Sequence, residues 1–293
     1  MTPDDNDPLL RQLLEIVREL DAENIPIILG GGMNRYLSQK YMSSRMPRYP
    51  FDLATRSTND LDIFLSSGLI VDAGRMERLR LVIERLHYKV IPKAKNFQFA
   101  KEVDLYGQKQ TVKIDLLAAP PQDADRAKVD ISKPRIKPKG AKDIHAYLTD
   151  EAKGIEIGKL AVDIGLLDPE LKLKHEILFL PSAFNTLILK LHAFADRKDR
   201  EDSDFGRHHA LDIFATVARM NERDWKIAQG HLASHRGQDY LTEALRIRKE
   251  NFSQRSDIGS IRLQENESYQ QNRRIYDQYL EFFIKDLVDL FPD

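Results

Sequence analysis

The sequence predicts an α+β fold, in which an N-terminal mixed sheet flanked by helices is followed by a C-terminal helical bundle. In the first part, apolar residues at helical spacing alternate with short segments that suit strands. From Ser182 onward, apolar residues recur almost wholly at helical spacing. With 293 residues the chain is long enough for two domains, which we predict at 1–180 and 181–293.

Composition excludes several classes of protein. Hydrophobic residues make up 42% of the chain, too many for a disordered one, and there is no cysteine for a disulfide framework or a thiolate metal site. No apolar run approaches the ~18–20 residues that span a bilayer, and the acidic start lacks the features of a signal peptide. We expect a cytoplasmic globular protein with no membrane partner. Because the net charge is −1, any nucleic-acid binding must come from local patches.

The first part is predicted to alternate helices and strands. Leucines at helical spacing predict a helix over 8–22, and the run Ile25–Leu29 predicts a short strand that ends at three glycines. The other elements expected here are a helix over 33–41, a loop over 43–58, a strand over 59–65, a helix over 76–88, and strands over 97–106 and 110–117. These strands are expected to form one mixed sheet.

The remaining chain is predicted to pass from a loop into helices. No periodicity is visible over 120–142, and residues 131–142 contain five basic residues and no acid. We predict a basic loop there, which is also the best local patch for an RNA backbone. Short strands are possible over 155–180. Amphipathic helices are expected from 182 and over 207–220, 223–235, 238–250 and 264–290.

Three aspartates carry the strongest chemical signal. In the strand over 59–65, Asp60 and Asp62 share one face and lie about 6–7 Å apart along the chain. In the strand over 110–117, Asp115 interrupts an apolar pattern, where a carboxylate is costly unless it is paired or metal-bound. If the two strands are neighbours, three carboxylates converge, as a two-metal site requires. The alternatives are ordinary surface polarity for the first two residues and a structural lysine partner for Asp115.

A glycine run precedes the acidic pair by about thirty residues. Gly30, Gly31 and Gly32 stand at a predicted strand-to-helix turn, where the backbone can approach an anion closely. The run matches neither the G-x-x-x-x-G-K-[ST] nor the G-x-G-x-x-G pattern. A glycine run by itself is commonly a tight turn. Together with the acidic pair, it is a far more specific indication of a functional site.

These motifs resemble those of the nucleotidyltransferase superfamily that includes DNA polymerase beta. The chain looks closest to the AbiEii-type toxin family, in which a Gly-Gly turn occurs together with an R-x-T-x-D-[IL]-D motif, here Arg56-Ser-Thr-Asn-Asp-Leu-Asp62. The segments 184–190 and 193–197 resemble that family's lysine-bearing helix, and Leu211-Asp212-Ile213 resembles its downstream acid. The resemblance covers roughly residues 25–220 by short motifs.

The resemblance implies a role for each residue of the sheet. Asp60 and Asp62 would bind the metals that hold the triphosphate, and Asp115 would ligate the catalytic metal and help deprotonate the acceptor hydroxyl. Backbone amides of Gly31 and Gly32 would hold the terminal phosphates. Two Mg²⁺ ions and an NTP substrate are therefore expected.

Three further residues receive roles from the same resemblance. Lys190 would contact the triphosphate or the base, with Asp212 positioning it. Without the motif, the residues favour a lysine that extends past a core edge into solvent. Arg56 would either contact phosphate or pair with an acid.

Two positions depart from the family pattern. Met33 stands where the family commonly has Ser or Thr, and His208-His209 stand before Asp212 where it typically has Lys-Asp. The histidines are expected at the surface or as caps. The difference at His208-His209 bears on the role that the resemblance implies for Asp212.

The leading hypothesis is a metal-dependent, toxin-like nucleotidyltransferase that moves a nucleoside monophosphate from an NTP to a hydroxyl and releases pyrophosphate. The resemblance suggests RNA, tRNA or a protein side chain as acceptor, and an antitoxin partner by analogy. One alternative is a small-molecule transferase of the aminoglycoside-modifying kind. The other is a nucleotide- or partner-binding protein of the same fold without turnover.

Overall fold

The computed structural model describes residues 8–42, 47–51, 60–94, 96–105, 108–164 and 177–292. These residues form two compact units. The sheet unit contains the described residues of 8–42 and 60–181, and the helical unit contains 47–51 and 182–292. The chain therefore leaves the sheet unit after its second helix, contributes a short segment to the helical unit, and returns at Asp60.

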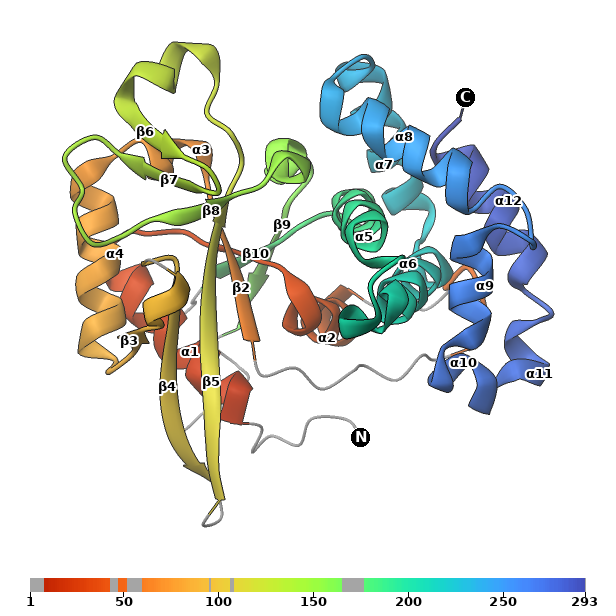
Figure 1. Cartoon of the computed structure of the whole chain (residues 1–293), viewed down its shortest axis with the longest axis horizontal. Helices are drawn as coiled ribbons and strands as arrows, with labels where there is room; N and C mark the ends of the chain where they lie inside the picture. Colours follow the sequence, from red (N-terminus) through yellow and green to blue (C-terminus); the bar gives the residue numbers. More distant parts are fainter. Residues whose placement is uncertain are drawn as a thin grey trace. The chain divides into compact units, whose positions relative to one another are not determined.

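The sheet unit is built on one mixed sheet, as the sequence predicted, and this sheet contains ten strands among the described residues (Figure 1). The order is β6-β7-β8-β5-β2-β1-β10-β9, with β4 paired to β5 and β3 paired to β4. The strands are β1 (Ile28–Leu29), β2 (Asp60–Leu65), β3 (Lys89–Val90), β4 (Gln98–Leu105), β5 (Gln108–Ala118), β6 (Val129–Ser132), β7 (Arg135–Pro138), β8 (Ala146–Leu148), β9 (Leu160–Asp163) and β10 (Ile177–Leu180). β2 runs parallel to β5 and antiparallel to β1.

The described residues of this unit form the α-helices α1 (Pro8–Ala22), α2 (Gly31–Met42), α3 (Ser67–Ile70) and α4 (Ala73–Arg85). The predicted bounds of the first helix are confirmed. α4 begins before the predicted Met76 because the Asp72 side chain caps it, accepting a hydrogen bond from the Arg75 amide at 3.0 Å. α2 also begins early, so Gly31 and Gly32 lie inside its first turn. Short 3₁₀ helices occur at Pro92–Ala94, Asp123–Lys128 and Asp150–Gly154.

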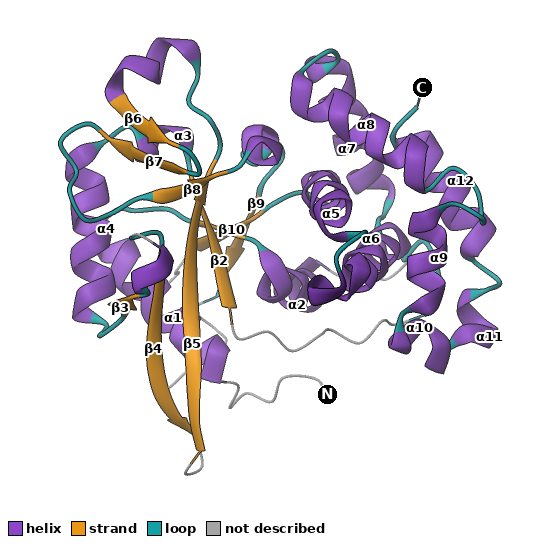
Figure 2. Ribbon diagram, viewed as in Figure 1, coloured by secondary structure: helices purple, strands orange, loops and turns teal. Residues whose placement is uncertain are grey.

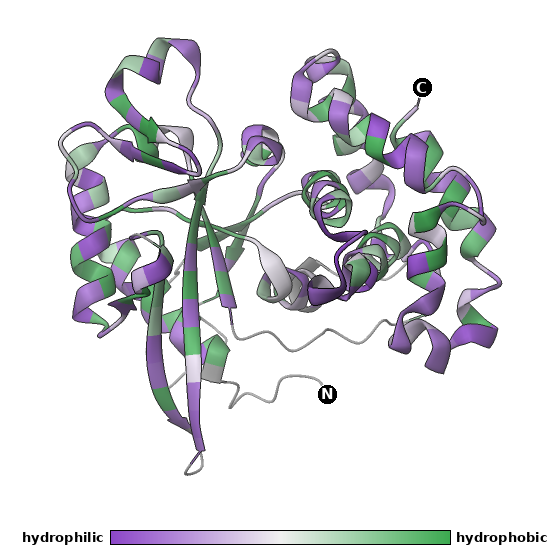
Figure 3. Ribbon diagram, viewed as in Figure 1, coloured by the Kyte–Doolittle hydropathy of each residue, from purple (hydrophilic) through white to green (hydrophobic). Residues whose placement is uncertain are grey.

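The core of the sheet unit lies on one face of the central strands. Leu61, Ile63, Ile114 and Leu116 are each at most 1% exposed and pack in one cluster with residues of α1 and α4. Figure 3 shows hydrophilic and hydrophobic residues following one another along β5. The alternation places the polar residues of β2 and β5 on the opposite face.

The basic loop predicted near 120–142 is wrong for residues 129–138. β6 and β7 pair there as an antiparallel hairpin, and β7 pairs with β8. Ile136 is fully buried against the core, so the apolar positions between the basic residues hold the hairpin to the sheet. The segment Arg-Ile-Lys-Pro contains a proline, which is unusual in a strand, and this obscured the alternation of Ile136 and Pro138 with the basic residues.

The helical unit contains only helices and loops among its described residues (Figure 2). The α-helices are α5 (Ala183–Arg197), α6 (Arg207–Arg219), α7 (Glu222–His235), α8 (Asp239–Asn251), α9 (Ile258–Glu265), α10 (Glu267–Gln271), α11 (Arg273–Tyr276) and α12 (Leu280–Leu290), with a 3₁₀ stretch at Glu201–Gly206. The single helix predicted over 264–290 is wrong. Asn266 ends α9 and caps α10, its side chain accepting a hydrogen bond from the Ser268 amide at 2.9 Å. None of the described helices is long and apolar enough to cross a membrane.

The segment 47–51 is fixed to the helical unit by polar and aromatic contacts. Arg48 makes two hydrogen bonds to the buried carboxylate of Asp286, at 2.8 and 2.5 Å, and the Tyr49 hydroxyl donates a third at 2.7 Å. The Tyr49 amide donates to the Ala218 carbonyl at 3.0 Å. Phe51 packs on Phe214 with ring centroids 5.5 Å apart. The predicted loop over 43–58 therefore contains a segment with specific contacts in the second unit.

Candidate functional site

The site is built from the register of β2 against β5. The two strands are parallel neighbours, and Asp62 lies directly opposite Asp115 while Asp60 lies opposite Lys113. Side chains at paired positions and at i, i+2 positions point to the same side of a sheet. The carboxylates of Asp60, Asp62 and Asp115 therefore share one face. The strand adjacency that the three-carboxylate hypothesis required is confirmed.

This face is open to solvent, in contrast to the buried face behind it. The Asp60 side chain is 44% exposed and lies 3.6 Å from the Lys113 ammonium, which is 46% exposed. A salt bridge with this exposure contributes little stability. The residues are thus held in place by the strand backbone rather than by their mutual pairing.

Asp115 is half-buried and lies in a strand with buried neighbours on both sides. Its Oδ2 accepts a hydrogen bond from Gln98 Nε2 at 3.0 Å, and its buried Oδ1 meets no hydrogen-bond donor among the described residues. Burial, and then the charge of the nearby Asp62, raise the pKa of Asp115 to about 6, against the opposing effect of the Gln98 hydrogen bond. A positive charge beside Asp62 and Asp115 would stabilise both carboxylates and lower the pKa of Asp115.

The glycine turn lies directly against Asp62. Gly31 has φ +63°, and a Cβ there would overlap Asp62 Oδ2 and come within 3.0 Å of Asp62 Cγ. The Gly30 amide donates to the Asp62 carbonyl at 2.7 Å, which fixes the start of α2 to β2. The N-terminal end of a helix favours negative charge, so the Asp62 carboxylate occupies a favourable position. Met33, which departs from the family pattern, is 3% exposed and packs in the core.

The donor set fits a hard divalent cation, but the side chains are not closed around one point. Among the described residues, no three His, Cys, Asp or Glu side chains are placed so that they could hold one ion. The reason is that each carboxylate meets a different neighbour: Asp60 meets Lys113, Asp62 meets Gly31 and Asp115 meets Gln98. Oxygen ligands from carboxylates are those that Mg²⁺ prefers, and Asp115 Oδ1 is a buried acceptor without a donor in this part of the chain. Binding an ion would require the Asp62 and Asp115 side chains to turn from their present positions.

Lys190 and Asp212 meet within the helical unit, on α5 and α6. The Lys190 ammonium lies 2.8 Å from Asp212 Oδ2, and the two side chains are only 16% and 10% exposed. This contact is the one expected if Asp212 positions Lys190. His209 is 9% exposed, so the expectation of a surface histidine is wrong there. Burial, and then the charge of Lys190, lower the pKa of His209, which keeps its ring neutral.

Arg56 lies outside the described residues, so its two alternatives stay predictions. One residue at the acidic face was not predicted, Gln98 on β4. The alternation of β5 predicts Lys113 on the same face as Asp115, and the structure places it there, beside Asp60. Nothing in the sequence indicates that Gln98 lies opposite Asp115, because that follows from the β4–β5 register.

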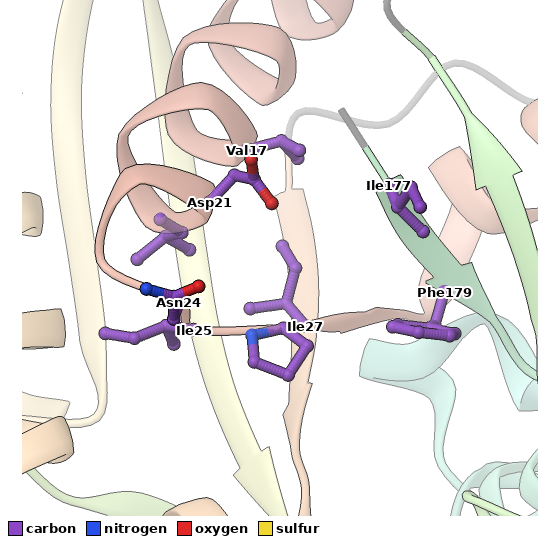
Figure 4. Close-up of a pocket in the computed structure, with 9 residues that line it drawn as sticks. Val17, Asp21, Asn24, Ile25, Ile27, Ile177 and Phe179 are labelled. Atoms are coloured by element: carbon purple, nitrogen blue, oxygen red, sulfur yellow. The ribbon is translucent and has the colours of Figure 1, made fainter. Parts of the chain in front are cut away.

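A pocket of about 260 Å³ lies elsewhere in the sheet unit, at the end of α1 beside β1 and β10 (Figure 4). Its lining is mostly apolar, with Asp21 and Asn24 as the polar members. None of the predicted site residues lines it.

No protein-family model matches the chain. Nor does the chain match any curated protein. Among solved structures, it is similar to an antigenic nucleotidyltransferase-like protein from Paracoccidioides brasiliensis, at 13% identity and a TM-score of 0.37, over 94% of this chain and 93% of that one. A TM-score of this size does not establish a shared fold, so the function must be argued from the residues.

Proposed function

We propose that the protein is a metal-dependent nucleotidyltransferase, which transfers a nucleoside monophosphate from an NTP to a hydroxyl acceptor. The observation that carries the proposal is the register of β2 and β5, which sets Asp62 opposite Asp115 and Asp60 on the same open face. Two separate strands supply these three carboxylates, and a helix begins beside them at Gly31. The resemblance to the AbiEii-type family, with the antitoxin partner that it suggests, rests on the sequence motifs alone.

Asp60, Asp62 and Asp115 would hold the cations. Two Mg²⁺ ions bound there would neutralise charge on the triphosphate and favour the alkoxide form of the acceptor. The protein itself needs to do little covalent chemistry in such a transfer, because positioning and charge neutralisation supply most of the rate. The β2–β5 ladder fixes the three Cα positions, and the core residues between them keep each carboxylate on the open face.

The transfer balances as a single displacement. The acceptor oxygen bonds to the α-phosphorus, and the bond from that phosphorus to the oxygen that bridges to the β-phosphate breaks. Pyrophosphate leaves with that oxygen. The hydroxyl proton passes to Asp115, whose buried Oδ1 accepts no hydrogen bond from the described residues.

The nucleotide would be held by backbone amides and by a lysine. The amides of Gly31 and Gly32 lie in the first turn of α2, where they have no carbonyl of the same helix to bond. From the sequence resemblance alone, we assign Lys190 to a phosphate or to the base of the nucleotide. Within the helical unit its ammonium lies 2.8 Å from Asp212. Asp212 is then a positioning residue.

The test is transfer of label from α-³²P-labelled NTPs in the presence of Mg²⁺, with cellular RNA, cellular protein and aminoglycosides as separate acceptors. We expect label on one acceptor with wild-type protein and a loss of at least about 100-fold with Asp60→Ala. Asp104→Asn, on the neighbouring strand β4, is the control and should keep full activity. Equal labelling by wild type and Asp60→Ala would refute the proposal. Tight binding of Mg²⁺-NTP with no pyrophosphate release on any acceptor would favour the binding-protein alternative.

A further inference from the structure

The open face that carries the aspartates continues across the sheet onto β8 and β7. Leu117, two residues after Asp115 on β5, pairs with Tyr147 on β8, and Tyr147 pairs with Arg135 on β7. Paired residues point to the same side, so the side chains of Tyr147 and Arg135 lie on the face of Asp115. The alternate residues of β7 and β8 point to the other face of the sheet and are buried, since Ile136 and Ala146 are both 0% exposed.

Tyr147 presents an aromatic ring to solvent on this face. Its exposed fraction is 40%, although it sits in a strand between two others. Its edge is supported by Phe97, whose ring centroid is 5.5 Å away at an interplanar angle of 58°. Phe97 is itself tied to β5, because its carbonyl accepts a hydrogen bond from the Leu116 amide at 2.9 Å. The ring of Tyr147 is therefore a supported, accessible stacking surface.

Arg135 adds a positive charge beside the ring. It is half-buried, and its buried Nε has no hydrogen-bond acceptor among the described residues. The neighbouring Lys137 on the same face is already engaged, since it donates to the Ala141 carbonyl at 2.6 Å and lies 3.9 Å from Asp130. No ion pair of the Arg135 guanidinium with a carboxylate is found among the described residues, so Arg135 is a basic group of this hairpin that can pair with an anionic ligand.

We propose that Tyr147 and Arg135 form a binding site for a nucleobase and its phosphate, next to the three aspartates. An aromatic ring stacks on any base, and an arginine beside it binds the phosphate, which is how sequence-tolerant nucleotide sites are built. This proposal rests on the proposed function, since it places the nucleotide next to the reacting centre at Asp115. The binding of nucleotides by Tyr147 and Arg135 can nevertheless be measured without the transfer reaction. The base belongs either to a free nucleotide or to a strand of single-stranded RNA, since both present the same chemistry.

Fluorescence anisotropy of the full-length protein tests the site. The probes are fluorescein-labelled oligouridylate and oligoadenylate, each of about ten nucleotides, and a fluorescent ATP analogue, all in EDTA so that metal binding does not contribute. Tyr147→Ala should weaken binding about 5- to 150-fold, and Tyr147→Phe should restore it. Arg135→Ala should weaken binding and reduce the salt dependence by about one phosphate contact.

Two surface variants in the helical unit serve as controls. Phe282→Ala removes a ring that is 59% exposed, and Arg274→Ala removes an exposed basic side chain. Both should leave binding unchanged. Thermal unfolding of Tyr147→Ala checks that the variant is folded before its affinity is compared.

The outcomes separate the two sources of the base and the two proposals. Weaker binding of the oligonucleotides alone assigns the site to a single strand, and weaker binding of the ATP analogue as well assigns it to a free nucleotide. If Tyr147→Ala binds every probe as wild type does, the site does not exist. Failure of the transferase proposal would be seen differently, as unchanged label transfer by Asp60→Ala.

Discussion

Substitution of Gly31 by alanine tests how closely the start of α2 approaches the acidic face. The change adds one methyl group at a residue with φ +63°, where the new Cβ would overlap Asp62 Oδ2. The substitution therefore acts twice: it strains the backbone and it displaces the carboxylate. Both effects fall on the sheet unit, within the first turn of α2.

The magnitude follows from these two contributions. A non-glycine residue in the left-handed region costs roughly 1–2 kcal/mol. Displacing the Asp62 side chain adds about 1 kcal/mol, the cost of an off-rotamer side chain. We expect the free energy of unfolding to fall by about 2–3 kcal/mol. Gly68→Ala is the matched control, because a Cβ there has no heavy atom within 4 Å, and it should change stability by less than about 1 kcal/mol.

Urea unfolding of both variants measures the difference. A double-mutant cycle with Asp62→Ala then separates the two contributions, because removing the carboxylate should recover about 1 kcal/mol of the loss and leave the backbone strain. If Gly31→Ala is as stable as wild type, α2 does not begin against Asp62 as described. A loss that is unchanged in the Asp62→Ala background would mean that only the backbone matters.

Three further predictions concern the helical unit. A Cβ on Gly259 would lie 2.5 Å from a backbone oxygen at the end of α8, so Gly259→Ala should lower the urea midpoint by an amount equivalent to about 2 kcal/mol or more; an unchanged midpoint would contradict the packing of α9. Asp286→Asn removes the charge that Arg48 contacts, and since Arg48 is 46% exposed we expect a loss of only about 1–2 kcal/mol, with a null effect showing that segment 47–51 is not anchored there. Burial lowers the pKa of His231 to about 4, so the unfolded chain binds more protons at this residue between pH 6.5 and 4, and His231 should lower stability by about 3 kcal/mol as pH drops through that window, in addition to the loss from the buried His209. His231→Gln should flatten this slope in equilibrium unfolding while the exposed His87→Asn keeps it, and equal slopes would rule out the buried histidine as the cause.

The faces of the two acidic strands could be predicted because alternation within a strand is local. Asp62 in β2 and Asp115 in β5 each stand between residues that are at most 1% exposed, so the sequence alone assigned the direction of their side chains. The adjacency of these strands is a long-range pairing, and the residues of either strand do not specify it. The three-carboxylate hypothesis requires this adjacency, and the register of Asp62 with Asp115 satisfies the requirement.

The hairpin β6–β7 was missed for a physical reason. Its fixed position comes from Val129 and Ile136, which are buried in the core, and basic residues and prolines stand between and around them. A pattern search weighs each residue equally, whereas the stability of such a hairpin depends on a few buried positions. The same difference explains the helices after 258. The periodicity of apolar residues predicts one continuous helix there, but Asn266 caps α10 and so separates it from α9.

The site residues that sequence reasoning missed are those whose position depends on register. Gln98 reaches Asp115, and Tyr147 reaches the same face, only because β4 and β8 pair with β5 at particular residues. By contrast, the contact of Lys190 with Asp212 joins two helices that were both predicted, and only their packing was unknown.

Manganese binding, measured by electron paramagnetic resonance with and without ATP, tests most directly whether the three carboxylates act together. If they do, wild-type protein holds Mn²⁺ and each of Asp62→Asn and Asp115→Asn weakens it at least about tenfold, while Asp104→Asn does not. Unaltered manganese affinity in both variants would show that this face of the sheet holds no cation.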